Sequence, residues 1–205
     1  MASFHRILAG LTSTEIKSRL DGSSGEPGRI ELGFNPDPRL LRDAAVLVPL
    51  VRENDSWSVL LTARTDLVED HKGQVAFPGG AVEPGDITPE AAAIREAEEE
   101  IGLPNGSAEI LGRLSEYQTI SKYLVTPVVA VVAWPFPLKL QTREVRRAFT
   151  IPLEFLAQPA NHSERLTEIR GQVVPLIYFK PWQGETLWGI SARIMLDFLV
   201  RLDLH

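Results

Sequence analysis

Apolar residues gather along the chain in short runs of the length and composition typical of β-strands. Valine, leucine, isoleucine and aromatic residues dominate these runs, and polar or glycine-containing segments separate them, a pattern that predicts buried strands. The runs are residues 44–51, 57–64, 75–77, 108–114, 124–134 and 172–179. A polar turn, Glu53-Asn54-Asp55, joins the first two runs, so we expect neighbouring strands there.

Other segments carry the signals of helices. Thr88 suits a helix N-cap, and Pro89 suits the first helical position, where no backbone N–H is needed. The helix that they open is expected to end near Ile101, and Gly102 supplies a left-handed C-cap. Further helical patterns are expected at residues 1–20, 153–156 and 187–202.

The chain of 205 residues is long enough for one globular domain with a small extension. Residues 21–39 are rich in glycine, serine and proline, which is typical of an irregular lead-in. We therefore divide the chain into an N-terminal helix and lead-in at residues 1–43 and one domain at residues 44–205. Because strands outnumber helices and the first strands are close neighbours, we predict an α/β fold with a mixed sheet covered by helices.

Composition argues against several classes of protein. The absence of cysteine excludes disulfides, thiolate metal sites and a cysteine nucleophile. The sequence has no apolar run of about eighteen residues that could span a membrane. Residues 1–20 lack the long apolar core of a secretory signal, and the last residues are not a peroxisomal address. A cytoplasmic protein without a membrane partner is therefore expected.

The formal net charge of -6 is concentrated in one segment. Residues 83–100 contain seven acidic side chains and one basic side chain, Arg95, so this segment alone carries -6 and the rest of the chain is balanced. Such a segment repels itself unless solvent or cations neutralise it. The sequence has no basic stripe with interleaved aromatic residues, which disfavours nucleic acid as a partner.

Three of these acidic residues share one face of the predicted helix. Glu96, Glu99 and Glu100 stand at positions i, i+3 and i+4, so their neighbouring Cβ atoms lie roughly 5–6 Å apart. The opposite face is apolar and can pack on the sheet. Carboxylate oxygens on a fixed face suit Mg²⁺ or Mn²⁺, which also bind substrate phosphates. In isolation such a run is more often a solvated acidic surface. The neighbouring sequence is therefore needed to distinguish a metal site from such a surface.

Residues 79–103, GGAVEPGDITPEAAAIREAEEEIGL, resemble the Nudix box, G-x5-E-x7-R-E-U-x-E-E-x-G-U, in which U is apolar. The stretch from Arg95 to Leu103 follows the pattern residue by residue. Two features depart from it, because Asp86 replaces the first glutamate and the spacer before Arg95 is one residue longer. Both departures precede the helix, and Asp86 is expected to shape the loop rather than bind metal. The resemblance implies a Nudix fold, an α/β/α sandwich with a mixed central sheet and a loop-helix-loop at the box.

These departures, together with a segment upstream, are similar to the coenzyme A pyrophosphatase branch of the Nudix family. Residues 60–80, LLTARTDLVEDHKGQVAFPGG, resemble its signature L-L-T-x-R-S-x-x-L-x-x-H-x-G-Q-x-x-F-P-G-G. Thr65 stands for serine, Val68 stands for leucine, and Glu69 occupies a place that is often basic. Residues 188–194, WGISARI, are similar to the W-G-x-T-A-x-I stretch that opens the final helix of that branch.

The resemblance implies roles for individual residues. Glu96, Glu99 and Glu100 would hold the metal ions, Mg²⁺ or Mn²⁺, and Arg95 would orient the carboxylates. Glu144 is a candidate general base from a later loop, with a surface glutamate between basic neighbours as the alternative. The candidate substrate-binding residues are Arg64, His71, Gln74, Gly79 and Gly80.

The implied function is metal-dependent hydrolysis of the pyrophosphate of coenzyme A and its derivatives, giving 3′,5′-ADP and 4′-phosphopantetheine or its acyl form. Because Glu69 is negatively charged, a Nudix enzyme that acts on another nucleoside diphosphate derivative, such as ADP-ribose, stays an alternative. The positive charge that the 3′-phosphate of coenzyme A needs could come from Lys72, Arg146 and Arg147 only if the fold brings them near. A non-catalytic nucleotide-sensing Nudix domain is a further alternative. Many Nudix proteins are dimers, so a homodimer also stays open, with residues 1–43 as a contributor to its interface.

Overall fold

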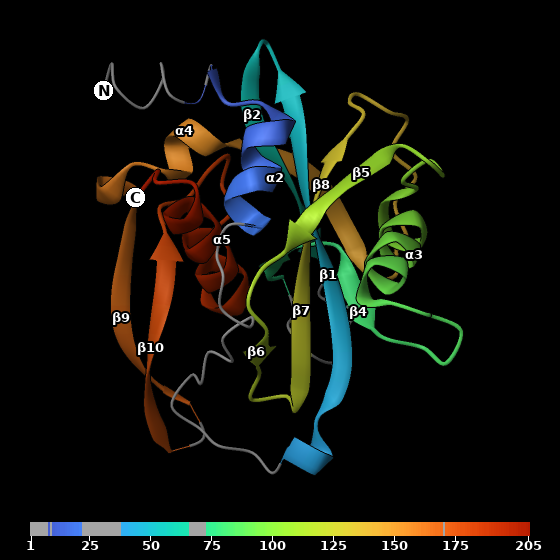
Figure 1. Ribbon diagram of the computed structural model, residues 1–205. Helices are drawn as coiled ribbons and strands as arrows, with labels where there is room; N and C mark the ends of the chain where they lie inside the picture. The colour runs from blue at the N-terminus through green and yellow to red at the C-terminus, as the bar shows by residue number, and fades with distance from the viewer. Residues whose placement is uncertain (1–7, 9, 22–37, 66–72, 170) are drawn as a thin grey trace.

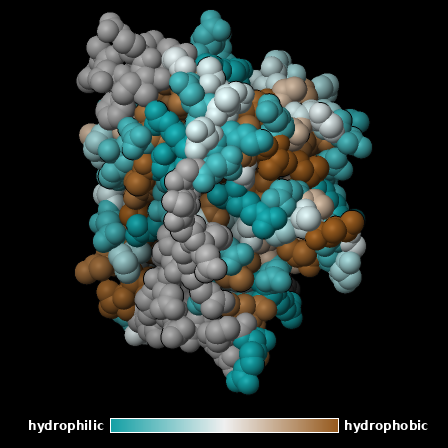
Figure 2. Space-filling view, in the orientation of Figure 1, coloured by the Kyte–Doolittle hydropathy of each residue, from teal (hydrophilic) through white to brown (hydrophobic). Residues whose placement is uncertain are grey.

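A mixed β-sheet with helices on both faces forms the centre of the molecule (Figure 1). The computed structural model describes residues 8, 10–21, 38–65, 73–169 and 171–205. Within these ranges, no helix combines the length and the apolar character needed to cross a lipid bilayer. The face seen in Figure 2 is a mosaic of hydrophilic and hydrophobic residues rather than one continuous apolar surface.

The central sheet is built around two long parallel strands. Its strands are β1 (Arg42–Glu53), β2 (Ser56–Arg64), β3 (Val75–Ala76), β4 (Gly79–Ala81), β5 (Ala108–Arg113), β6 (Tyr117–Gln118), β7 (Tyr123–Val132) and β8 (Val145–Pro152). The order is β3-β2-β1-β7-β5, while β4 pairs with β1, β6 with β7 and β8 with β2. β1 and β7 are parallel, and the other pairs are antiparallel. The predicted mixed sheet is therefore confirmed.

A second sheet and six helical segments complete the described structure. The second sheet is an antiparallel pair, β9 (His162–Ile169) and β10 (Gln172–Phe179). The helical segments are α2 (Ser13–Asp21), a 3-10 turn (Pro38–Leu40), α3 (Pro89–Ile101), α4 (Leu153–Leu156), a second 3-10 turn (Pro159–Asn161) and α5 (Gly189–Arg201). Figure 1 shows α3 on one side of the sheet and α5 on the other. Part of the predicted N-terminal helix is thus present as α2, whereas most of the predicted lead-in lies outside the described residues.

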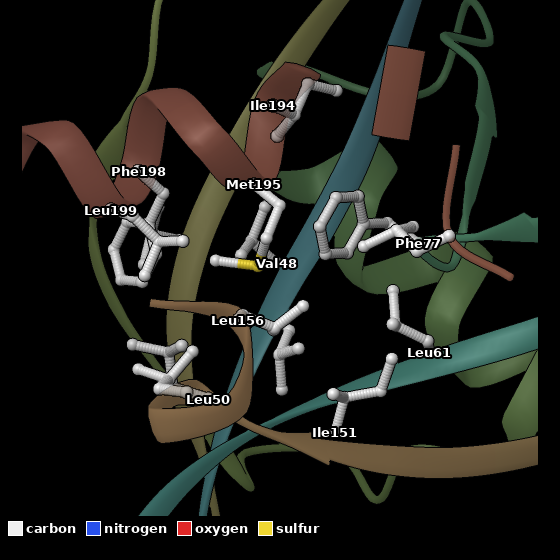
Figure 3. Close-up of a cluster of buried hydrophobic side chains, with 14 of the residues drawn as sticks. Val48, Leu50, Leu61, Phe77, Ile151, Leu156, Ile194, Met195, Phe198 and Leu199 are labelled. Carbon is white, nitrogen blue, oxygen red and sulfur yellow. The ribbon is translucent and has the colours of Figure 1, made fainter. Parts of the chain in front are cut away.

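Side chains of β1 divide the interior into two layers. Leu47 is fully buried in the layer that contains Ala97 of α3. Val48, the next residue, is fully buried in the layer that contains Met195 of α5, as Figure 3 shows. Ile16 of α2 is also buried in this second layer. Each large apolar side chain that is fully buried stabilises the fold by about 1.5–3 kcal/mol, so both faces of the sheet are held firmly.

Apart from the N-terminal helix, the predicted elements are confirmed with small differences at their ends. α3 begins and ends at the predicted residues, but α5 begins later than expected. Leu187 and Trp188 pair with the end of β10 instead of joining the helix. The N–H of Phe179 donates to the carbonyl of Leu187 at 2.9 Å, and Trp188 forms an antiparallel β-bridge with Tyr178. The strands β8 and β9 were not predicted.

Candidate active site

The acidic helix α3 is fixed at both ends and along its apolar face. The N–H of Ala91 donates to Thr88 Oγ1 at 3.2 Å, which confirms Thr88 as the N-cap. Gly102 has φ 70° and closes the other end through hydrogen bonds to the carbonyls of Ala97 and Glu98, a left-handed conformation that favours glycine. Ala97 is itself fully buried against the sheet. The helix therefore cannot rotate, and its glutamates point in fixed directions.

The three candidate metal ligands lie at different depths on α3. Glu100 is buried, with 4% of its surface exposed. The side chain of Glu96 is 17% exposed, and that of Glu99 is 60% exposed. The three glutamates thus extend from the interior of the protein to solvent. A site that binds an ion and also admits a substrate needs such an arrangement.

Arg95 joins the loop before α3 to two of the glutamates. Its Nη2 lies 3.0 Å from Asp86 Oδ2, and its Nη1 lies 3.0 Å from Glu96 Oε1 and 3.2 Å from Glu99 Oε1. Asp86 also accepts the backbone N–H of Glu83 at 2.8 Å. The hydrogen bond from Arg95 and then the one from Glu83 lower the pKa of Asp86. In this structure Asp86 holds the loop and Arg95 together.

The two glycines of β4 serve different neighbours. A Cβ on Gly80 would lie 2.5 Å from Glu96 Oε1, so this glycine makes room for the carboxylate. A Cβ on Gly79 would lie 2.4 Å from the carbonyl oxygen of Ala45, which belongs to the backbone of β1. Gly80 therefore shapes the site, and Gly79 allows β4 to approach β1.

Arg64, at the end of β2, lies between two carboxylates from other elements. Its Nη1 lies 4.0 Å from Glu100 Oε1, and its Nη2 lies 3.9 Å from Glu144 Oε2. Glu144 directly precedes β8, and its side chain is 47% exposed. Arg64 Nε and Glu100 Oε2 are buried and have no hydrogen-bond partner within the described part of the chain. The fold thus brings the predicted residues Arg64, Glu100 and Glu144 together.

Burial and neighbouring charges change the acidity of the inner glutamates. Burial raises the pKa of Glu100 to about 8, and the charges of Glu96 and Glu144 add to this, while the nearby Arg64 opposes it. Burial also raises the pKa of Glu96, against the effect of its hydrogen bond from Arg95. A deep carboxylate with such a pKa is unfavourable as a free anion and becomes favourable beside a cation.

The other predicted substrate-binding residues are only partly covered by the structure. The carbonyl of Gln74 accepts the N–H of Arg64 at 2.9 Å, so Gln74 lies beside the site. His71 lies outside the described residues. Thr65, which the sequence marked only as a departure from a signature, follows Arg64 and is buried.

The donor groups of this site fit a hard divalent cation. Glu96, Glu99 and Glu100 supply only oxygen, the ligand type that Mg²⁺ and Mn²⁺ prefer, and Glu100 Oε2 is a buried acceptor to which no described residue donates. Among the residues that the structure describes, no three Asp, Glu or His side chains already converge on one metal position. Arg95 instead neutralises Glu96 and Glu99, so these side chains would have to turn toward an ion.

A family model for the NUDIX domain matches residues 41–177 of this chain. This range includes the glycine turn, Arg95 and the three candidate metal ligands of α3, Glu96, Glu99 and Glu100. The chain belongs to the Nudix family. It is a Nudix hydrolase, and the reaction that the family supports is hydrolysis of the pyrophosphate bond in nucleoside diphosphate derivatives. Nudix hydrolases generally use divalent metal ions such as Mg²⁺ or Mn²⁺.

Similar proteins of the family match most of the chain. The Uncharacterized Nudix hydrolase NudL of Photorhabdus laumondii is 35% identical over 171 residues, which cover 82% of this chain and 90% of the relative. The protein of the same name from Yersinia pestis (strain Pestoides F) is 37% identical over 155 residues, covering 75% of this chain and 76% of the relative.

Solved structures of Nudix proteins show the same fold. The MutT/nudix family protein from Enterococcus faecalis has a TM-score of 0.54 and 17% identity, and the match covers 94% of this chain and 75% of that chain. The MutT protein from Methanosarcina mazei Go1 has a TM-score of 0.50 and 20% identity, with 80% of this chain and 94% of that chain covered. The predicted Nudix α/β fold is confirmed.

The two glycines of this Nudix site should respond differently to alanine. Gly80→Ala displaces the carboxylate of Glu96, and we expect it to lower kcat about tenfold or more with little change in Tm. Gly79→Ala forces the backbones of β1 and β4 apart, and we expect it to lower the free energy of unfolding by about 1–3 kcal/mol. Gly85→Ala is the control, because a Cβ there meets nothing within 4 Å. Unchanged turnover in Gly80→Ala would show that Glu96 needs no such space.

Proposed function

We propose that this Nudix hydrolase cleaves the pyrophosphate bond of coenzyme A and its derivatives, giving 3′,5′-ADP and 4′-phosphopantetheine or its acyl form. The observation that carries the proposal is the position of Arg64 against Glu100, with 4.0 Å between Nη1 and Oε1. Arg64 belongs to the segment that resembles the coenzyme A signature, and Glu100 belongs to the Nudix box. Residues from two different motifs, which overlap only at Gly79 and Gly80, therefore lie close together.

In this proposal the residues of α3 bind the cation and the residues around it bind the substrate. Glu96, Glu99 and Glu100 hold Mg²⁺ or Mn²⁺, which when bound neutralises the diphosphate and lowers the pKa of an attacking water. Arg95 orients the carboxylates of Glu96 and Glu99 through its contacts to both.

The substrate side of the site is formed by β2, β4 and the segment before β8. Arg64 is placed to bind a phosphate oxygen through its planar guanidinium group, with Gln74, His71 and the backbone of Gly79 and Gly80 as further contacts. Glu144 is the candidate general base, because its carboxylate and that of Glu100 both lie within 4.0 Å of the guanidinium group of Arg64.

The 3′-phosphate of coenzyme A needs a positive partner, and two candidates are already engaged. Arg146 Nη2 lies 2.8 Å from Glu185 Oε1, and Arg147 Nη2 donates to Gln183 Oε1. Both follow Glu144 closely, but their guanidinium groups bind the turn at residues 182–185. A 3′-phosphate could use Arg146 only in competition with Glu185.

A panel of diphosphates tests the substrate part of the proposal. We expect kcat/KM for coenzyme A to exceed that for ADP-ribose by at least about tenfold with Mg²⁺ or Mn²⁺, because a site built for one polar substrate discriminates strongly against another. A matched measurement with dephospho-coenzyme A shows how much the 3′-phosphate contributes. A higher kcat/KM for ADP-ribose than for coenzyme A would assign the enzyme to another nucleoside diphosphate derivative.

Divalent metal should stabilise the protein without any substrate. Because the carboxylates of α3 repel one another, Mg²⁺ at about one hundred times its Kd should add about 2.7 kcal/mol to the free energy of unfolding, which raises Tm by several degrees. Scanning calorimetry with MgCl₂ and with NaCl of equal ionic strength separates binding from screening. An equal Tm in the two salts would contradict a metal site on α3.

A further inference from the structure

Thr65 is a buried polar residue at the end of β2, directly after Arg64. Its side-chain hydroxyl donates to the carbonyl of Arg143 at 2.8 Å, and its backbone N–H donates to the carbonyl of Glu144 at 2.9 Å. Only 8% of its surface is exposed, so water does not compete for these two bonds. One residue thus fixes two consecutive peptide carbonyls in the segment that carries Glu144.

The other end of the same segment is attached to the acidic helix. The N–H of Lys139 donates to the carbonyl of Ile101 at 3.0 Å, and the N–H of Gln141 donates to the carbonyl of Glu100 at 2.9 Å. The segment then closes on itself, because the N–H of Glu144 donates to the carbonyl of Gln141 at 2.9 Å. Residues 139–144 therefore bridge the last turn of α3 and the end of β2.

We propose that Thr65 is a positioning residue for Glu144. Its hydroxyl holds the peptide before Glu144, so that the carboxylate reaches Arg64 Nη2 at 3.9 Å on the side opposite to Glu100. A backbone shift of about 1 Å at a catalytic group lowers the rate strongly, so this hydrogen bond matters for turnover although Thr65 touches no substrate. The inference rests on the proposed function, in which Glu144 is the general base.

Substitutions at Thr65 separate the hydroxyl from the volume of the side chain. Thr65→Val removes the donor and keeps the shape, and we expect kcat to fall about tenfold while KM stays within about twofold. Thr65→Ser keeps the donor and should restore kcat. Thr62→Val is the matched control, because Thr62 lies on β2 just before Thr65, is buried, and donates its hydroxyl to the carbonyl of Ala76 at 3.2 Å. It should leave kcat unchanged.

A double-mutant cycle shows whether Thr65 acts through Glu144. In the Glu144→Gln background, Thr65→Val should cause no further loss of kcat, because the group that it positions is already absent. Multiplicative losses from the two substitutions would overturn the inference, as would a valine variant with full kcat or a serine variant no better than valine. If coenzyme A and the other diphosphates are not hydrolysed by the unmodified protein, the proposed function fails instead.

Discussion

Glu99→Gln is expected to lower kcat for pyrophosphate hydrolysis by roughly two to three orders of magnitude while Tm in the absence of metal is unchanged. Glu99 is the exposed member of the three glutamates, with 60% of its side chain accessible, so it contributes little to the folded core. Glutamine keeps the size of the side chain but removes the negative charge that a cation needs. Steady-state kinetics and thermal unfolding of the same preparation provide the two measurements.

Glu98→Gln is the matched control for this prediction. Glu98 is the neighbouring residue on α3, it is also exposed, and it occupies the variable position of the Nudix box. The same change of charge there should leave kcat within about twofold, because surface charges act weakly through solvent. Full activity in Glu99→Gln, or an equal loss in Glu98→Gln, would contradict a specific ligand role for Glu99.

The metal-free protein is expected to lose stability as the pH rises from about 5 to about 8. The pKa of Glu100 is about 8 in the folded state, against 4.5 for an ordinary glutamate. Between these values the folded protein keeps a proton that the unfolded chain releases, so the free energy of unfolding decreases with pH. Above the folded pKa the full loss is reached, on the order of a few kcal/mol. Thermal unfolding in EDTA at several pH values measures this loss of stability.

Glu100→Gln isolates this effect from other titrating groups. Burial lowers the pKa of His162, with a smaller effect of His205, so His162 contributes stability that is lost as the pH falls. That contribution is common to both proteins and cancels in their difference. We expect Tm of Glu100→Gln to decline less than Tm of the unmodified protein between pH 5 and pH 8. Parallel curves would show that Glu100 is not the source.

The sheet and the acidic helix were predictable because their signals are local. The strands at the centre are continuous apolar runs, as strands buried on both faces are, and α3 carries both its N-cap, Thr88, and its C-cap, Gly102, in the sequence. The same is true of the glutamate face, since the spacing of residues on a helix fixes which of them are neighbours.

The strands β8 and β9 were not predictable because their sequences lack those signals. In β8, Arg146 and Arg147 interrupt the apolar pattern, and they bind the turn at residues 182–185 rather than the core. In β9, most residues are polar and exposed, and within the described part of the chain this strand pairs with β10 alone. Backbone pairing with β10, rather than burial of its own side chains, makes β9 a strand, whereas β8 also buries Val145, Phe149 and Ile151 in the core.

The meeting of Arg64, Glu100 and Glu144 could also not be read from the sequence. It depends on the pairing of β2 with β8, which places Arg64 opposite Val145 and therefore beside Glu144. It depends equally on the packing of α3, which turns Glu100 toward the end of β2. Contacts between distant segments of this kind follow from the whole fold, so the sequence could name Glu144 only as a candidate.

Product analysis shows directly whether this protein cleaves coenzyme A at its pyrophosphate bond. Coenzyme A is incubated with the protein and Mg²⁺ or Mn²⁺, and the products are separated and identified by mass. We expect 3′,5′-ADP and 4′-phosphopantetheine in equal amounts, with neither formed in EDTA and both formed about a hundredfold or more slowly by Glu99→Gln. Intact coenzyme A after incubation with either metal, or products formed equally well in EDTA, would contradict it.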